Sequence, residues 1–353
     1  MTSSAFNAHL SELRSLVEAA LSDELRRATW PASLKNAVEY SLMAGGKRLR
    51  PVLVLLANEA CGGKREDAIL AACAIEMIHT YSLIHDDLPS MDDDDFRRGR
   101  PTSHKVFGEA LAVLAGDCLL TLAFETIASS PVAGRQITEL ARILASAAGG
   151  AGMVGGQVLD LEAERGGGVR AESGERKAET SPITGCESSA SAVEKRGILA
   201  AFTGDLAASR SRISESEQNE SNQSPETRVA ELSQIHKMKT GALIAGALEL
   251  GAVTALADDE SRIRLRNYGH FIGLAFQIAD DLLDVTGDQS KLGKKPGRDA
   301  DLGKLTYPGL LGIEVSREKA AQLVHEACQA LETFGERSVW LKELARFIVE
   351  RDH

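Results

Sequence analysis

Residues 67–95 read DAILAACAIEMIHTYSLIHDDLPSMDDDD, an apolar run that leads directly into a dense group of aspartates. The apolar part, 67–84, is rich in Ala and Ile and predicts a long buried helix. Pro89 predicts the end of this helix, so Asp86 and Asp87 should lie at its C-terminal end, where the helix dipole disfavours anions. Stability alone therefore does not explain why so many carboxylates follow one another here.

A bound divalent cation would explain the acidic segment 86–95. Its ligands would be hard oxygens, without His or Cys, and such a donor set indicates Mg²⁺ or Ca²⁺. A solvated acidic loop explains the segment equally well when it is considered alone.

A second acidic cluster lies far along the chain, inside a strongly apolar helical pattern at 271–285. Asp280 and Asp284 are four residues apart and share one helical face, and Asp281 flanks it. Unpaired carboxylates are costly to bury in so apolar a segment. Because Mg²⁺ is commonly held by one or two carboxylates plus substrate phosphates, two clusters predict two sides of a cavity that binds a phosphorylated substrate.

Basic residues interleave with these clusters, although the chain carries a formal charge of −11. Arginine forks and lysine point charges are the groups that phosphate oxygens require. The sequence contains no GxxxxGK[ST] loop and no GxGxxG fingerprint, so it does not support a P-loop or Rossmann nucleotide site. The cations concerned are Lys47, Arg50, Arg97, Arg98, Lys237, Lys239, Lys294 and Lys295.

Helical periodicity dominates the rest of the chain. Hydrophobic residues make up 43% and aromatic residues only 4%, so the core should consist mainly of Ala, Leu, Ile and Val. No segment alternates convincingly as a strand, and we expect one all-α domain over residues 1–353. Helical patterns cover 6–25, 51–60, 107–127, 136–148, 232–250, 259–285, 317–334 and 338–349.

Residues 165–228 break the helical pattern because they are rich in Ser, Glu, Gly, Asn and Gln. Such a composition buries too little apolar area to offset the entropy of ordering, and it predicts a disordered or mobile surface insertion of low complexity. A short apolar island at 198–206 could form a marginal helix. We expect a tolerated insertion without a function, and a regulatory or partner-binding loop is the alternative.

Charge and cysteine usage narrow the class of protein further. The acidic balance excludes a broad nucleic-acid-binding surface. The five cysteines are scattered and form no CxxC pair, which argues against a disulfide framework or a structural zinc site and favours a reducing, cytoplasmic setting. Residues 1–21 show no secretory signal, and no stretch approaches about 18 uninterrupted apolar residues, so we expect no membrane span.

Taken in order, these motifs resemble those of the short-chain trans-prenyltransferases, or polyprenyl synthases, and most of all bacterial farnesyl diphosphate synthases. The motifs GGKRLRP, RRG and KTG and both aspartate clusters carry the resemblance, which covers nearly the whole chain except the insertion. It implies an isoprenoid-synthase-type helical bundle around a central cavity, capped by the two clusters, and a homodimer. The matching stretches are 45–51, 76–104, 116–120, 155–161, 239–244, 276–288 and 303–311.

The resemblance also implies roles for individual residues, whereas His85 is left outside the site. The Mg²⁺ ligands would be Asp86, Asp87 and Asp92 on one side of the cavity and Asp280, Asp281 and Asp284 on the other. The isopentenyl diphosphate site would consist of Lys47, Arg50, His79 and Arg98. The allylic diphosphate site would consist of Arg97, Lys239, Thr240, Gln277 and Lys294. The expected catalytic residues are Lys239, Thr240, Gln277, Arg97 and Arg98.

The implied reaction is the Mg²⁺-dependent, head-to-tail condensation of isopentenyl diphosphate with dimethylallyl or geranyl diphosphate. Diphosphate becomes a good leaving group once metal ions and cationic side chains neutralise its charge. The isopentenyl double bond then attacks the allylic cation, and a proton is lost to the released diphosphate. No side-chain nucleophile is required, and the sequence shows no Ser-His or Cys-His arrangement.

Product length should depend on the bulk of side chains about one helical turn upstream of Asp86. Tyr81 lies five residues upstream and Ser82 four, and in the resembled family an aromatic residue here tends to stop growth at fifteen carbons. Farnesyl diphosphate is therefore the expected product. The alternative for Tyr81 is simple packing between helices.

Three other functions stay open. A geranylgeranyl diphosphate synthase is the first, because residues 76–105 resemble those enzymes as well. A non-catalytic prenyl diphosphate-binding subunit would usually lack one cluster or the cations, and both are present here. A class I terpene cyclase would not need the second diphosphate site at Lys47 and Arg50.

Overall fold

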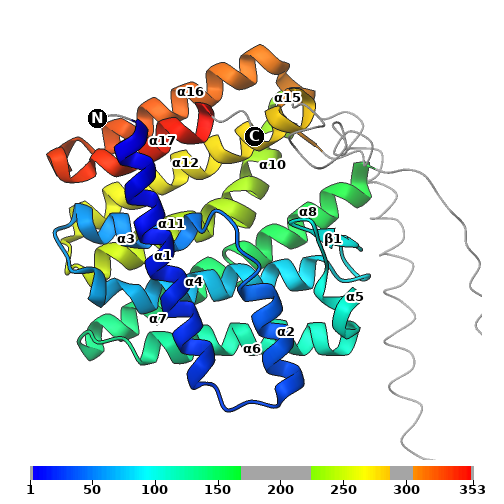
Figure 1. The fold of residues 1–353 in the computed structure, drawn as a ribbon. Coiled ribbons are helices and arrows are strands. Elements are labelled where there is room, and N and C mark those ends of the chain that lie inside the picture. Colours follow the sequence, from blue (N-terminus) through cyan, green and yellow to red (C-terminus); the bar gives the residue numbers. More distant parts are fainter. Residues whose placement is uncertain (1–2, 168–223, 287–304, 351–353) are drawn as a thin grey trace, which may run out of the picture.

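The apolar run before the first aspartate cluster forms helix α4 (Arg65–Asp86), which lies in the middle of the molecule (Figure 1). Helices α3 (Leu49–Ala60), α6 (Glu109–Ala128) and α11 (Ala242–Thr254) pack against it. Because it is enclosed, α4 buries small and aliphatic side chains around most of its circumference rather than along one stripe. The helix ends ahead of Pro89, as the sequence predicts.

The structure is a computed structural model, and it describes residues 3–167, 224–286 and 305–350. This part is helical apart from one short hairpin, which confirms the predicted all-α class. The other elements are α1 (Ser3–Arg27), α2 (Ala32–Leu42), β1 (Phe96–Arg97), β2 (Arg100–Pro101), α5 (Ser103–Phe107), α7 (Gly134–Ala148), α8 (Met153–Gly167), α10 (Pro225–His236), the π-helix η1 (Lys237–Gly241), α12 (Asp259–Thr286), α15 (Tyr307–Leu311), α16 (Ile313–Ala330), the 3₁₀ helix η2 (Glu332–Ser338) and α17 (Val339–Glu350).

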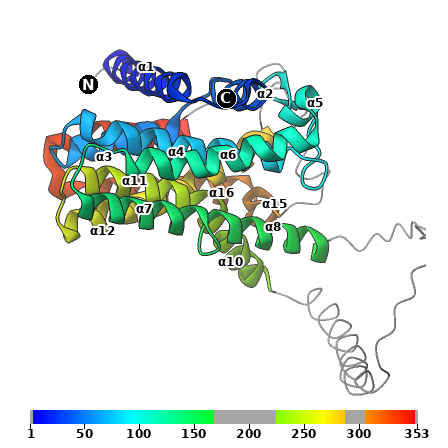
Figure 2. The same ribbon diagram turned by 90° about the horizontal axis from the view of Figure 1, so that it is seen from below.

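The helices pack in layers. Figure 2 shows α1 and α2 on one side of a layer that contains α3, α4 and α6, with α7, α11 and α12 on the other side of that layer. Helix α12 packs against both α11 and α16, so the second aspartate cluster, at the end of α12, is carried by the opposite part of the bundle from α4. The helices that lead to the two aspartate clusters therefore lie in different layers of the bundle (Figure 2).

The hairpin of β1 and β2 is a difference from the sequence prediction, which contained no strand. Arg97 pairs with Arg100, and Arg98 and Gly99 between them both have positive φ, 54° and 73°. A two-residue turn with positive φ at both positions matches the right-handed twist of antiparallel strands. Strands of two residues are too short to show an alternating pattern, so the sequence carried no signal for them.

Helices reach further into the predicted insertion than expected. Helix α8 continues to Gly167, and α10 begins at Pro225 with the Ser224 hydroxyl accepting from the Thr227 backbone N–H at 3.3 Å. A serine cap followed by proline is a common helix start. The rest of the predicted insertion, including the apolar island at 198–206, lies outside the described residues.

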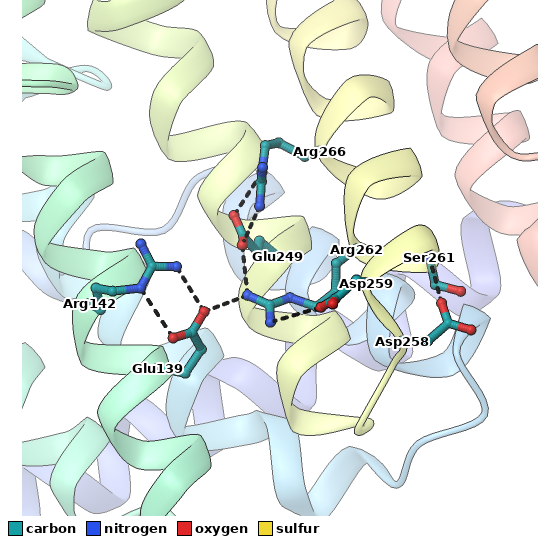
Figure 3. A network of polar contacts seen from close by, with 8 residues as sticks. All are labelled: Glu139, Arg142, Glu249, Asp258, Asp259, Ser261, Arg262 and Arg266. Carbon is teal, nitrogen blue, oxygen red and sulfur yellow. Dashed lines mark hydrogen bonds and ion pairs between the residues drawn. The ribbon is translucent and has the colours of Figure 1, made fainter.

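A network of charged side chains ties α7, α11 and α12 together (Figure 3). Glu249 of α11 is 7% exposed and accepts hydrogen bonds from Arg262 and Arg266 of α12, at 2.9 and 2.6 Å. Arg262 also donates to Glu139 of α7 at 2.6 Å, and Arg142 donates to the same carboxylate. A buried carboxylate needs such partners, because an unpaired charge is costly to desolvate. The network therefore holds three helices in a defined arrangement.

Two described helices, α4 and α6, are long and apolar enough to pass a test for membrane spans, which rests on length and composition only. Within the apolar window of α4, 72% of residues are buried inside the bundle, and within that of α6, 44%. A helix that fills a protein core meets the same criteria, so this observation is weak evidence for a membrane. The four described cysteines, Cys61, Cys73, Cys118 and Cys328, are free thiols.

Candidate active site

The loop after α4 folds back so that Asp92 returns to Asp86. The backbone N–H of Asp92 donates to the carbonyl oxygen of Asp86 at 2.9 Å. The Asp86 carboxylate accepts a hydrogen bond from the side-chain amide of Gln157 on α8. Burial raises the pKa of Asp86 to about 6, and the charge of Asp92 adds to this, while Lys239 acts in the opposite direction. The site therefore places the charge of the exposed Asp92 near the half-buried Asp86 carboxylate.

Arg97, on β1, forms an ion pair with Asp87. Its Nε donates to Oδ1 and Oδ2 of Asp87 at 2.7 and 2.9 Å, and its Nη2 lies 2.7 Å from Oδ1. Burial raises the pKa of Asp87 despite this partner. The expected allylic-diphosphate arginine and one expected metal ligand thus neutralise each other in this structure. A diphosphate that took Arg97 would leave the Asp87 carboxylate available to a metal ion.

Arg98 links the hairpin to the loop before α3. Its guanidinium donates to the carbonyl oxygen of Gly45 and lies over Gly46, where a Cβ atom would come within 2.6 Å of the guanidinium carbon. Gly46 also has a φ of 120°, which side chains disfavour. Gly46 of the GGKRLRP motif therefore leaves the space in which the Arg98 guanidinium lies, whereas a Cβ atom at Gly45 would meet nothing within 4 Å.

A buried ion pair holds the backbone of the same loop. Arg48 has a left-handed conformation, with φ 48°, and donates to Glu76 of α4 at 2.8 Å and to the Leu42 carbonyl oxygen at 2.7 Å. Both side chains are almost completely buried, so this pair is a structural anchor. Next to this ion pair, Lys47 is exposed, and Arg50 lies in the first turn of α3.

Arg50 of α3 and His79 of α4 lie close enough together for the Arg50 charge to act on the imidazole. Burial lowers the pKa of Arg50, while Glu76 and, from the end of α12, Asp280 act in the opposite direction. Burial lowers the pKa of His79 well below its ordinary value, and the nearby guanidinium groups, those of Arg50 and Arg98 first, lower it further. His79 is therefore a neutral hydrogen-bonding group among arginines. The structure brings together three of the four residues expected to bind isopentenyl diphosphate.

The KTG motif adopts a π-helix, a form that often marks functional positions. Lys239 Nζ donates to Asp160 of α8 at 2.5 Å, and the Thr240 hydroxyl donates to the side-chain oxygen of Gln277 on α12 at 3.0 Å. Gly156 of α8 makes room for this backbone, because a Cβ atom there would lie 2.2 Å from the Lys239 nitrogen. The three expected residues Lys239, Thr240 and Gln277 thus form one wall of the site.

The aspartates of the second cluster have different surroundings. Asp280 and Asp284 share a face of α12 and are half-buried. Asp281 is 6% exposed and accepts a hydrogen bond from the Tyr307 backbone N–H at 3.0 Å, at the start of α15. This contact gives Asp281 a structural role that the sequence motif did not reveal.

The residues expected to limit product length are buried on α4. Tyr81 is 7% exposed, and its ring meets that of His85 edge-on at a centroid distance of 5.7 Å. The Ser82 hydroxyl donates to the His79 carbonyl oxygen at 2.9 Å. His85 lies over Gly116 of α6 and is 3.1 Å from the Val113 carbonyl oxygen, so it packs between α4 and α6.

The chemistry of the donors suits a hard cation. Asp86, Asp92, Asp280 and Asp284 offer carboxylate oxygens only. Burial first, and then the charge of Asp92, raise the pKa of Asp86, and a bound cation would stabilise its charged form. Within the described residues, no three carboxylate, imidazole or thiol groups lie close enough together to hold a metal ion as they stand. The residues thus fit Mg²⁺ by donor type, and the substrate phosphates would complete its coordination.

Two polar residues of the site, Gln157 and Asp160, were not predicted as site residues. Both lie in the stretch 155–161, which the sequence analysis recognised as similar to the family without assigning a role to its side chains. They bind Asp86 and Lys239, respectively. The sequence signal for them was the presence of polar residues on a partly apolar helix, directly after Gly155 and Gly156. Lys294, expected at the allylic site, lies outside the described residues.

Comparison with known proteins agrees with this arrangement. Residues 31–181 and 198–340 match the family model described as polyprenyl synthetase. The chain belongs to the polyprenyl synthetase family. The 182–197 gap in the match falls within the predicted insertion.

Individual relatives cover almost all of this family member. The chain is 39% identical to the farnesyl diphosphate synthase of Bacillus subtilis, over 98% of this chain and 97% of that protein. It is also 39% identical to a chloroplastic geranylgeranyl pyrophosphate synthase of Catharanthus roseus, over 99% of this chain and 82% of that protein. The crystal structure of a FPP/GFPP synthase from Zymomonas mobilis matches with a TM-score of 0.72 and 33% identity, covering 99% of this chain and 100% of that chain. The chemistry is that of a short-chain prenyl diphosphate synthase.

Proposed function

We propose that this synthase makes farnesyl diphosphate, by condensing isopentenyl diphosphate first with dimethylallyl and then with geranyl diphosphate. The observation that carries the proposal is the position of Tyr81. Its ring is buried on α4 below the first aspartate cluster, and burial together with the Asp86 charge raises the pKa of its hydroxyl. A bulky ring beneath the diphosphate site limits the depth that a growing chain can occupy.

The side chains around the clusters support this chemistry. Arg97, Lys239 and the polar pair of Thr240 and Gln277 would hold the allylic diphosphate as its bond to carbon breaks. Mg²⁺, when bound by the aspartates, supplies positive charge that stabilises the leaving diphosphate. Arg50, neutral His79 and Arg98 would orient isopentenyl diphosphate, whose double bond forms the new carbon–carbon bond before a proton is lost.

Product analysis tests the proposal. The protein is incubated with Mg²⁺, isopentenyl diphosphate and dimethylallyl diphosphate, and the dephosphorylated products are separated by chromatography. We expect farnesol as the main product of the natural chain, no product in EDTA, and longer alcohols from Tyr81→Ala. Ser82→Ala, which removes only a hydroxyl from the neighbouring position, should change the distribution much less. An unchanged distribution in Tyr81→Ala would reject the role of the ring.

A second candidate product is geranylgeranyl diphosphate. It is favoured by the equal identity of the chain to a named farnesyl and a named geranylgeranyl enzyme. The same incubation decides between them, because geranylgeraniol as the main product of the natural chain contradicts the farnesyl proposal. Absence of any elongation would instead contradict the prenyl transfer itself.

We also propose that the protein forms a homodimer through the outer face of α6. Helix α6 has a higher mean hydropathy than α4, 1.7 against 1.4. Even so, its Val113 and Leu114 side chains are 38% and 56% exposed, and exposed apolar side chains of this kind can mark a protein interface. Light scattering coupled to size exclusion should give twice the chain mass of 37.7 kDa, and Leu114→Asp should reduce it toward a monomer. A monomeric natural chain would contradict the proposal.

A further inference from the structure

A pocket lies between α2, α4 and the β1–β2 hairpin, and we call it the hairpin pocket. The space that the centres of water molecules can occupy in it is about 40 Å³. One water needs about 10–15 Å³ on this measure, so the pocket has room for a few waters. Tyr40 and Ser41 of α2 and Thr80, Leu83 and Ile84 of α4 line it on one side, together with Ala44 and Asp87, which follow these two helices. Arg97, Arg98 and Arg100 of the hairpin and Ser103 of α5 line it on the other.

The hairpin pocket is distinct from the expected isopentenyl diphosphate site. Lys47, Arg50 and His79, which define that site, are absent from its lining. On α4 the lining residues Thr80 and Asp87 occupy a face roughly a quarter turn away from His79 and Asp86. Of the lining residues, Arg98 alone belongs to the expected isopentenyl diphosphate site, whereas Arg97 belongs to the expected allylic site and Asp87 to the expected metal ligands. These three residues form a wall that the pocket shares with the reaction site.

The charge of the lining favours an anion. Three guanidinium groups and one carboxylate line the pocket, and that carboxylate is already paired with Arg97. Arg98 donates to a backbone carbonyl, and Arg100 lies over the ring of Tyr40, at 4.2 Å from its centroid, so two cations are held without a direct carboxylate ion pair among the lining residues. The Tyr40 hydroxyl in turn donates to the Pro101 carbonyl oxygen at 2.8 Å, which fixes the hairpin against α2.

A buried hydroxyl without a partner also belongs to the wall of this pocket. Ser103 lines it, is only 4% exposed, and its Oγ has no hydrogen-bond partner in the structure. A buried polar atom normally has a partner, and leaving it without one is costly. A ligand oxygen in the pocket would satisfy this group. Below it, Ala44, Leu83 and Ile84 provide an apolar floor.

We propose that the hairpin pocket binds a diphosphate group, separately from the reaction site. Arg98, Arg100 and the Ser103 hydroxyl hold the phosphate oxygens, and the bound group competes with Asp87 for Arg97. Two sources share this chemistry, the inorganic diphosphate that the reaction releases and the head group of a short prenyl diphosphate. Competition for Arg97 couples the pocket to the first aspartate cluster. The fraction of pockets that is occupied, and with it the pairing of Asp87, therefore depends on the concentration of these compounds.

Calorimetric titration of the full chain tests the proposal. The probes are inorganic diphosphate and isopentenyl diphosphate, in EDTA so that the aspartates bind no metal and no turnover occurs. Two classes of site are expected in the natural chain. Lys47→Gln should weaken the class at the reaction site only. Ser103→Ala and Arg100→Gln should weaken the other class about tenfold, as expected for a lost hydrogen bond to a charged group.

A matched control separates this effect from a change in folding. Ser130, between α6 and α7, is another buried serine whose hydroxyl has no partner, and it lies outside the pocket lining. Ser130→Ala and Ser103→Ala should have the same or higher thermal stability than the natural chain, because each loses an unpaired buried group. Only Ser103→Ala should lose affinity.

The outcomes are distinct from those of the product assay. Equal affinity of both probes for the second class assigns the pocket to the diphosphate alone, and tighter binding of isopentenyl diphosphate assigns the apolar floor to its tail. A single class of site, weakened by Lys47→Gln and unchanged in Ser103→Ala and Arg100→Gln, would overturn the proposal. This result would leave the proposed synthase activity untouched.

Discussion

Asp280 and Asp281 are neighbours in the sequence, yet the fold gives their carboxylates different tasks. Asp280 is half-buried and close enough to Arg50 to act on its pKa. Asp281 is buried and caps the start of α15 through the Tyr307 N–H. A helix places consecutive residues about 100° apart, so one of the pair faces the site while the other faces the neighbouring element.

Substitutions in this pair should therefore separate catalysis from stability. Asp280→Asn should lower kcat at least a hundredfold, because a neutral amide is a poor Mg²⁺ ligand. Asp281→Asn should stay within about tenfold of the natural chain, because the amide oxygen can still accept from Tyr307. Asp281→Ala leaves a buried N–H without a partner and should cost about 1–3 kcal/mol of stability.

Steady-state kinetics at saturating Mg²⁺ and thermal unfolding provide the measurements. A fall in kcat for Asp281→Asn that equals the fall for Asp280→Asn, at unchanged stability, would make Asp281 a metal ligand instead.

Residue identity and spacing led to the expected charged groups of the site, including Asp86, Asp92, Lys239 and Arg98, whose roles stay predictions. Their partners could not be predicted, because each partner lies on another element. Arg97 of the hairpin is paired with Asp87, which follows α4, and Lys239 is paired with Asp160 where α8 packs against η1. Spacing along one chain segment contains no information on such contacts.

Among the elements, the π-helix η1 depends on the close approach of α8. The periodicity of residues 232–250 predicts one continuous helix, whereas the structure has α10, a π-helical turn and α11 in this range. The wider turn carries Lys239 and Thr240. Only a glycine at position 156 leaves enough space for the backbone of this turn.

Gly156→Ala should consequently damage the site. The added Cβ would lie 2.2 Å from the Lys239 nitrogen, so η1 has to move. Overpacking of this kind costs about 1–3 kcal/mol, and we expect kcat to fall at least tenfold because Lys239 and Thr240 are displaced. Gly134→Ala on α7 is the matched control, since its Cβ would meet nothing within 4 Å. Natural turnover in Gly156→Ala would show that the site tolerates a shift of η1.

The charged network between α7, α11 and α12 should make stability depend on pH (Figure 3). Hydrogen bonds from Arg142 and then Arg262 lower the pKa of Glu139 from 4.5 to about 2. Below pH 4.5 the unfolded chain takes up this proton first, so the stabilising contribution of Glu139 is complete above about pH 4.5 and is lost as the pH falls toward 2.

Urea unfolding of Glu139→Gln and the natural chain checks this dependence. The unfolding midpoint of the variant should be lower at pH 7, and the difference between the two proteins should be smaller at pH 3. Glu318→Gln, at an exposed position of α16, is the control and should show little difference at either pH. A difference for Glu139→Gln that grows on acidification would contradict the assigned direction of the pKa shift.

For the whole molecule, the site is assembled from both sides of the insertion. Gln157 and Asp160 lie on α8 before it, and Lys239 and Thr240 lie on η1 after it. Helices α8 and α10, which flank residues 168–223, pack against each other and against η1. The contacts that hold this wall of the site therefore come from described helices.

Replacement of residues 168–223 by a short Gly-Ser linker should preserve the enzyme. We expect kcat within about threefold of the natural value and the same product length, because long surface insertions cost little and contribute few contacts. Circular dichroism verifies that the shortened chain is folded. A folded but inactive shortened chain would favour the regulatory alternative for the insertion.

The sequence by itself determined the all-α class, the family resemblance and the candidate acidic and basic residues of the site, because helical periodicity and motif spacing are local properties of the chain. Tertiary structure alone decided how these residues are used. In the fold, Arg97 pairs with Asp87, Asp281 accepts from the first residue of α15, and Gln157 and Asp160 bind Asp86 and Lys239. The hairpin pocket with its buried Ser103 hydroxyl likewise exists only in the folded chain. Each of these depends on contact between elements far apart in the chain, which burial and packing establish and which no local pattern encodes.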